Sequence, residues 1–137
     1  MSRERGQITV MTTGFFVFLG LLAVVIINSS AAFLQRQELD NLADGAALSA
    51  ADGLSEEAFY RHGVDTAVEL DPAEARRLVA SYVAASGGEV GEVSVTTMGD
   101  EVHVRMERTV TLAIAPPGWS SRTTIVSEAT SQLRLGD

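Results

Sequence analysis

The chain has 137 residues, which suits one small domain plus an anchor, and it carries ten arginines, no lysine and eighteen acidic residues. The formal net charge is −8, and the part after residue 35 carries −9 (eight arginines against seventeen acidic residues). This charge argues against nucleic acid or anionic lipid headgroups as partners of the domain, because both bind clustered cations. The absence of cysteine excludes a disulfide framework, a thiolate nucleophile and a cysteine-ligated metal.

The first element is an uncharged, apolar stretch near the amino terminus. Residues 6–35 carry no formal charge, and Phe15–Ile27 is apolar except for Gly20. About 20 apolar residues in a helix cross a hydrocarbon core of roughly 30 Å while satisfying their own backbone hydrogen bonds. We therefore predict a transmembrane helix over residues 8–30, after a cytoplasmic tail of residues 1–7, with Asn28 at its outer interface.

Two alternatives compete with this anchor. A buried core helix is disfavoured because so short a chain does not surround a long helix that is apolar all round. A cleaved signal peptide stays open, since Arg3 and Arg5 precede the apolar run and Ser30-Ala31-Ala32 supplies small residues for cleavage. We expect the anchor to be kept, because the helical pattern continues past Ala32.

The distribution of charge predicts the orientation in the cytoplasmic membrane. Residues 1–5 contain two arginines and one glutamate, whereas the chain after residue 35 contains eight arginines and seventeen acidic residues. The positive-inside rule places the amino terminus in the cytoplasm and the acidic part outside.

The helical pattern then continues outside the membrane, over residues 31–54. Apolar residues recur there at spacings of three and four, which is one face of a helix. This stripe consists of Leu39, Leu42, Ala43, Ala46, Ala47, Ala50, Ala51 and Leu54. Small side chains allow another backbone to approach closely, so the stripe packs either on the chain's own domain or on a helix of a partner.

The same region carries a resemblance. Arg5-Gly6-Gln7 precedes the anchor, Arg36 and Leu39 follow it, and Ala43–Ala51 reads ADGAALSAA. This combination resembles the N-terminal module of TadE/TadG-like proteins, minor pilin-like components of the Tad (tight adherence, Flp pilus) assembly system. The resemblance covers residues 3 to 54 and implies a pilin-like plan, in which a long helix carries a small head.

The sequence departs from this family at two positions. Asp40 stands where such proteins often carry glutamine. Tad prepilins that are processed carry a glutamate five residues after the cleavage-site glycine, and counting from Gly6 this position is Met11. The resemblance therefore implies an uncleaved, TadG-like protein.

Residues 55–137 predict a small extracytoplasmic α+β domain. Ser55 is placed to cap a short helix, which Gly63 divides or ends. A second helix begins at Asp71 as N-cap with Pro72 in its first position, and it ends at Gly87-Gly88.

After Glu89 the apolar period changes from 3.6 to 2, which predicts strands. Met98–Glu101 reads as a hairpin turn, and a second strand alternates from Val102 to Ile114 with one interruption at Arg108, where a bulge or an edge position is expected. A third strand is expected within residues 122–135. The fold class is α+β: a long transmembrane helix, then one or two helices on an antiparallel sheet of about three strands.

No residue pattern indicates catalysis. His62 and His103 lie in polar surroundings without metal-ligand spacing, and the chain has neither a nucleophile elbow nor a phosphate loop. We expect no enzyme activity, cofactor, metal or small-molecule substrate. Trp119, in a Pro-Pro-Gly-Trp loop, either folds back over the sheet or stays exposed as an anchor for a partner.

The leading hypothesis is a membrane-anchored pilin-like component or assembly factor of a Tad/Flp-type pilus system. Its partners are the lipid bilayer and other pilus-assembly membrane proteins or pilins, and it acts by helix-mediated association. The alternatives are a membrane-tethered extracytoplasmic sensor or accessory domain, and a secreted hydrolase released by signal cleavage.

Overall fold

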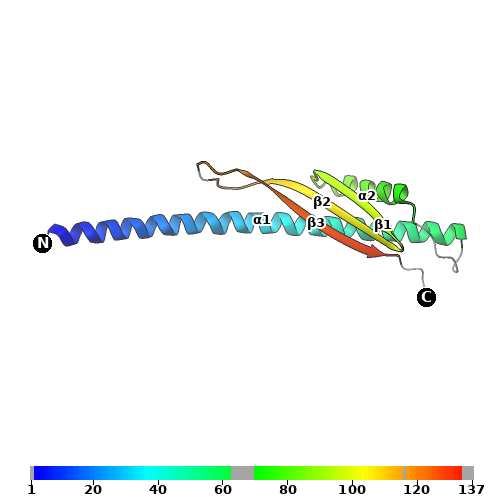
Figure 1. The fold of residues 1–137 in the computed structure, drawn as a ribbon, viewed down its shortest axis with the longest axis horizontal. Coiled ribbons are helices and arrows are strands. Elements are labelled where there is room, and N and C mark those ends of the chain that lie inside the picture. Colours follow the sequence, from blue (N-terminus) through cyan, green and yellow to red (C-terminus); the bar gives the residue numbers. More distant parts are fainter. Residues whose placement is uncertain (1, 63–69, 116, 134–137) are drawn as a thin grey trace.

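The structure is a computed structural model that describes residues 2–62, 70–115 and 117–133. Two helices precede a three-stranded antiparallel sheet of order β1-β2-β3 (Figure 1). The elements are α1 (Ser2–His62), α2 (Pro72–Ser86), β1 (Glu92–Met98), β2 (Glu101–Thr111) and β3 (Arg122–Gln132). The α+β fold class predicted from the sequence is confirmed.

Helix α1 is longer than the sequence analysis predicted. It runs without a break through 61 residues, about 90 Å at 1.5 Å per residue. The short separate helix expected after residue 54 is therefore wrong, because the Ser55 hydroxyl donates to the Ala51 carbonyl at 2.8 Å inside α1 and caps nothing. Gly63, the expected end of that helix, lies outside the described residues.

Helix α2 begins and ends where its local signals predict. The Asp71 side chain accepts a hydrogen bond from the Ala73 amide at 2.8 Å, and Pro72 occupies the first turn. Gly87 follows with a φ of 65°, the left-handed conformation that terminates helices. The apolar face of α2 is buried at Ala75 and Val79.

The strands are paired through one tight hairpin and one long connection. Met98 pairs with Glu101 across a two-residue turn in which Gly99 has a φ of 62°, as predicted. The bulge expected at Arg108 is wrong, because both pairings run through β2 without a skipped residue. The alternative, an edge position, agrees better with the structure. β1 pairs with β2 only as far as Glu107, so from Arg108 onward β2 pairs with β3 alone.

The outer half of α1 and the shorter α2 form one layer, and the sheet covers both. Strands β2 and β3 pack on α1, while β1 packs on α2 (Figure 1). The amino-terminal half of α1 extends away from this head, and among the described residues no other helix or strand lies beside it (Figure 1). Residues 39–58 of α1 thus belong to the head's core, and the helix passes the boundary predicted at residues 54 and 55 without interruption.

Candidate functional site

The stripe of small and branched residues on α1 lies in the core of the head. All eight of its residues are buried, with exposed fractions between 0% and 8%. They share one cluster with buried residues of α2 and of all three strands. The face that the sequence offered as a possible surface for partners is therefore filled by the chain's own side chains.

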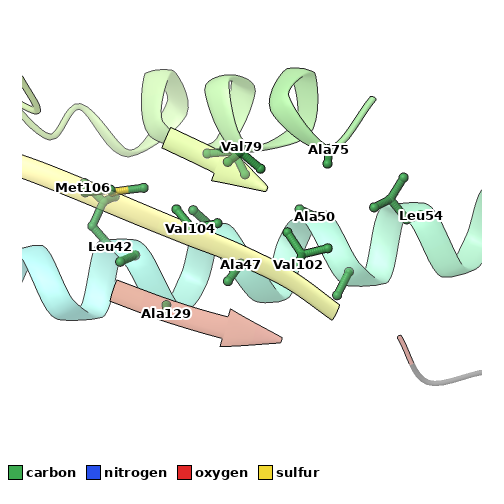
Figure 2. Close-up of a cluster of buried hydrophobic side chains, with 14 of the residues drawn as sticks. Leu42, Ala47, Ala50, Leu54, Ala75, Val79, Val102, Val104, Met106 and Ala129 are labelled. Atoms are coloured by element: carbon green, nitrogen blue, oxygen red, sulfur yellow. The ribbon is translucent and has the colours of Figure 1, made fainter. Parts of the chain in front are cut away.

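Figure 2 shows how the small residues of α1 are used. Val102 and Val104 of β2 lie over Ala47 and Ala50, while Val79 of α2 points toward the same cluster. An alanine face removes little apolar area from water per residue, but it lets a strand cross the helix closely enough to bury the branched side chains above it. The stripe therefore joins the anchor helix to the head.

Two glycines inside α1 let α2 approach in the same way. A side chain at Gly45 would collide with the Tyr82 ring, and one at Gly53 would lie 2.9 Å from a Leu78 methyl carbon. A glycine inside a helix costs about 1 kcal/mol relative to alanine. The structure shows what offsets this cost, since Tyr82 and Leu78 pack against the core at these two positions.

Overpacking this joint is expected to destabilise the head. Ala47 is 1% exposed, so Ala47→Leu forces three additional carbon atoms into a filled space beneath β2. We expect a loss of about 1–3 kcal/mol in the head's unfolding free energy, measured by hydrogen exchange of β2 amides in the detergent-solubilised full chain.

The same substitution at Ala80, on the exposed face of α2, is the matched control. Ala80→Leu is expected to change stability by less than about 0.5 kcal/mol. Equal protection of the β2 amides from hydrogen exchange in both variants would contradict the packing of Ala47 in the head.

Arg108 is an arginine on the inward face of β2. It shares the parity of the buried residues Val104, Met106 and Val110, and its side chain is only 11% exposed. The guanidinium lies 3.4 Å from the Glu38 carboxylate of α1 and donates to the Glu89 carbonyl at 2.5 Å. Its Nη2 is buried and has no hydrogen-bond partner among the residues that the structure describes.

This ion pair explains the interruption in the apolar alternation of β2. Arg108 lies just beyond the last residue of β2 that pairs with β1, and there its inward side chain meets the polar residue Glu38 of α1. The methylene groups of an arginine cover apolar surface while its guanidinium reaches a polar partner. The sequence marked Arg108 as an interruption of the alternation, but nothing in the sequence indicated its partner Glu38 on α1.

The outer face of the sheet is a polar network. Arg105 donates to Glu107 at 2.8 Å and to Glu128 at 2.6 Å, and these two hydrogen bonds raise the pKa of the guanidinium above its usual value. His103 lies 3.1 Å from Glu101 through Nε2 and 2.9 Å from the Thr130 hydroxyl through Nδ1. Within the described residues, no three metal-ligating side chains gather at one place.

The amino-terminal half of α1 is bare. Apart from the half-buried Val24, its large apolar side chains between Ile8 and Ile27 are 39% to 78% exposed, and the most apolar part of the helix contains no buried residue. A core helix would be covered by the chain, so this half is not one. Its length and composition are those of a segment that crosses a membrane.

Asn28 marks the place where this bare segment meets the head. Its side-chain amide donates to the Ile114 carbonyl at 2.5 Å and accepts from the Ile114 amide at 2.9 Å. Ile114 belongs to the connection between β2 and β3, which also carries Trp119. Trp119 is 73% exposed, so the expectation that it folds back over the sheet is wrong.

The helix that carries both the bare segment and the buried stripe also matches a known family. Residues 6–53 match the putative Flp pilus-assembly TadE/G-like family. The match covers about a third of the chain and confirms the resemblance noted in the sequence. No curated protein and no solved structure matches the chain.

The limits of the TadE/G-like match follow the geometry of α1. It begins at Gly6, the first residue of the charge-free stretch and two residues before the predicted anchor, and it ends at Gly53, one residue before the last member of the stripe. The matched family is one of pilus assembly, and the matched range lies within α1, a helix long and apolar enough to cross a membrane. The sheet and α2 lie outside the matched range.

Proposed function

We propose that the chain is a membrane-anchored, pilin-like component or assembly factor of a Tad/Flp-type pilus system, acting by helix-mediated association rather than catalysis. The amino terminus lies in the cytoplasm, the anchor crosses the cytoplasmic membrane, and the acidic head lies outside. The observation that carries this proposal is the coincidence of the family match with α1, one helix that is bare over its first half and buried in the head over its second.

The bare half of α1 supports association within the membrane. The outer half is already occupied by the chain's own sheet and α2, so it offers its apolar stripe to no partner. Side chains such as Phe16 and Val17, 67% and 58% exposed, face only lipid or the helices of other membrane proteins. We propose that pilus-assembly proteins or pilins contact the chain along this segment.

Single cysteines test the proposed orientation without background, because the chain has none of its own. Met98, 68% exposed at the tip of the head, and Ser2, at the start of α1, are the two positions. We expect a membrane-impermeant maleimide to label Met98→Cys in intact spheroplasts and Ser2→Cys only after lysis. The reverse pattern would show that the head lies in the cytoplasm.

Photocrosslinking tests the association in cells that assemble pili. A crosslinking amino acid at Phe16 is expected to form an adduct of defined mass with a pilus-system membrane protein, whereas the same amino acid at exposed Ala80 is the matched control. Deleting the gene is expected to reduce surface pili. Normal piliation of the deletion strain would contradict the proposed role, and adducts from Ala80 alone would move the association to the head.

A further inference from the structure

The connection between β2 and β3 is fixed to the membrane end of the head. It spans residues 112–121, is closed by a hydrogen bond of 2.7 Å from the Leu112 amide to the Ser121 carbonyl, and extends toward the amino-terminal half of α1 (Figure 1). The two hydrogen bonds between Asn28 and Ile114 hold it against α1. These two bonds fix the position of the connection along the axis of α1.

The position of Asn28 along α1 coincides with the outer boundary of the proposed anchor. Residues 8–27 are about 20 residues, or about 30 Å of helix, which equals the thickness of a hydrocarbon core. Asn28 is the next residue and therefore lies where the lipid headgroups begin. A loop bonded to Asn28 reaches the same depth.

The composition of the loop suits this depth. Residues 112–121 carry no formal charge, and the loop exposes Ile114 and Trp119 by 40% and 73%. Phe33 and Leu34 of α1, just beyond Asn28, are 65% and 64% exposed. Tryptophan is enriched at membrane–water interfaces, because its ring prefers the apolar side while its indole N–H stays hydrated.

The charges nearest to this end of the head have the sign that lipid phosphates attract. Following the chain outward from Asn28 along α1, and from the loop along β3, the first charged residues are Arg36 and Arg122. Both are exposed. The acidic residues that give the head its negative charge come later along both elements, beginning with Glu38 on α1 and Glu128 on β3.

We propose that the β2–β3 connection is a second membrane contact, with Trp119 and Ile114 in the headgroup region of the outer leaflet and Arg36 and Arg122 at its phosphates. The head then stands against the bilayer in one orientation instead of pivoting on α1. This inference rests on the proposed anchor. We favour a bilayer over a protein as the partner of this loop. The membrane that surrounds residues 8–27 already reaches the depth of the loop, whereas a protein partner would have to bind there in addition to the membrane.

Trp119 is the only tryptophan of the chain, so its fluorescence reports on this loop alone. The full-length protein is reconstituted into phosphatidylcholine vesicles that contain lipids brominated either near the headgroup or deep in the acyl chains. We expect a blue-shifted emission, strong quenching by the shallow bromines, weaker quenching by the deep ones, and protection from aqueous iodide.

The matched control moves the reporter to the opposite end of the sheet. The double variant Trp119→Phe/Met98→Trp places the indole at the β1–β2 turn, where Met98 is 68% exposed. Its emission is expected to be quenched by iodide and unaffected by brominated lipid. Asn28→Ala removes both bonds to Ile114 and is expected to weaken the quenching of Trp119 by shallow bromines.

The outcomes separate this inference from the proposed anchor. A chain that fails to float with vesicles in a density gradient lacks the anchor, and both proposals are overturned. A chain that floats while iodide quenches Trp119 fully and brominated lipid does not overturns the membrane contact alone. Protection from both quenchers also overturns it, because Trp119 is then covered by protein, such as a second copy of the chain.

Discussion

Met106→Ala is expected to lower the free energy of unfolding of the head by about 2–5 kcal/mol, the range for removing a large apolar side chain from a filled core. Met106 is 0% exposed on the inward face of β2, where it meets Leu42 of α1 (Figure 2). Truncation leaves a cavity between the central strand and the helix. Amides of β2 in the solubilised full chain should exchange about 30-fold faster at the lower bound of that range.

The matched control is Met98→Ala, the same substitution at an exposed position of the same β1–β2 hairpin. It is 68% exposed beside the β1–β2 turn, so Met98→Ala is expected to alter the unfolding free energy by less than about 0.5 kcal/mol. Unchanged protection of β2 in Met106→Ala would mean that the sheet does not pack on α1 through this residue.

Two arginines in the middle of the bare segment are expected to abolish membrane integration. Val17 and Leu21 are one turn apart and each 58% exposed. Each arginine makes the apparent free energy of inserting the helix into the membrane less favourable by roughly 3 kcal/mol. Insertion of the double variant Val17→Arg/Leu21→Arg is therefore less favourable by about 6 kcal/mol. We expect the protein to leave the membrane fraction on carbonate extraction.

Leu48 and Asp52 form the corresponding pair on the head. Both are exposed, and they have the same spacing on the same helix. Leu48→Arg/Asp52→Arg is expected to stay in the membrane fraction, since these positions face water in the proposed topology. Retention of the Val17→Arg/Leu21→Arg variant would mean that residues 8–27 do not lie in lipid.

The elements that the sequence predicted correctly depend on neighbours along the chain. Asp71 and Pro72 start α2, Gly87 ends it, and Gly99 makes the hairpin turn, because caps and tight turns involve only a few consecutive residues. The apolar anchor is equally local, since its length and lack of charge already meet the requirements of a bilayer.

The end of α1 shows where such local signals are overruled. Ser55 has the chemistry of a helix cap, and it was therefore expected to begin a new helix. In the folded chain, Leu54 and Ala58 are buried one turn apart against the head, so α1 continues on the same face and Ser55 bonds back to Ala51 instead. Burial against the sheet and α2 outweighs the preference of one polar side chain.

The sequence by itself determined that a charge-free stretch, residues 6–35, leads into an acidic α+β head, and that the helical residues after this stretch carry small apolar side chains on one face. Only the tertiary structure decided what covers that face and where the β2–β3 loop lies. Asn28 and Ile114 are 86 residues apart, and Arg108 meets Glu38 across 70 positions of the chain. No periodicity or local motif encodes such pairs, because they form only after the sheet has packed on α1 and thereby set the loop's height on the anchor.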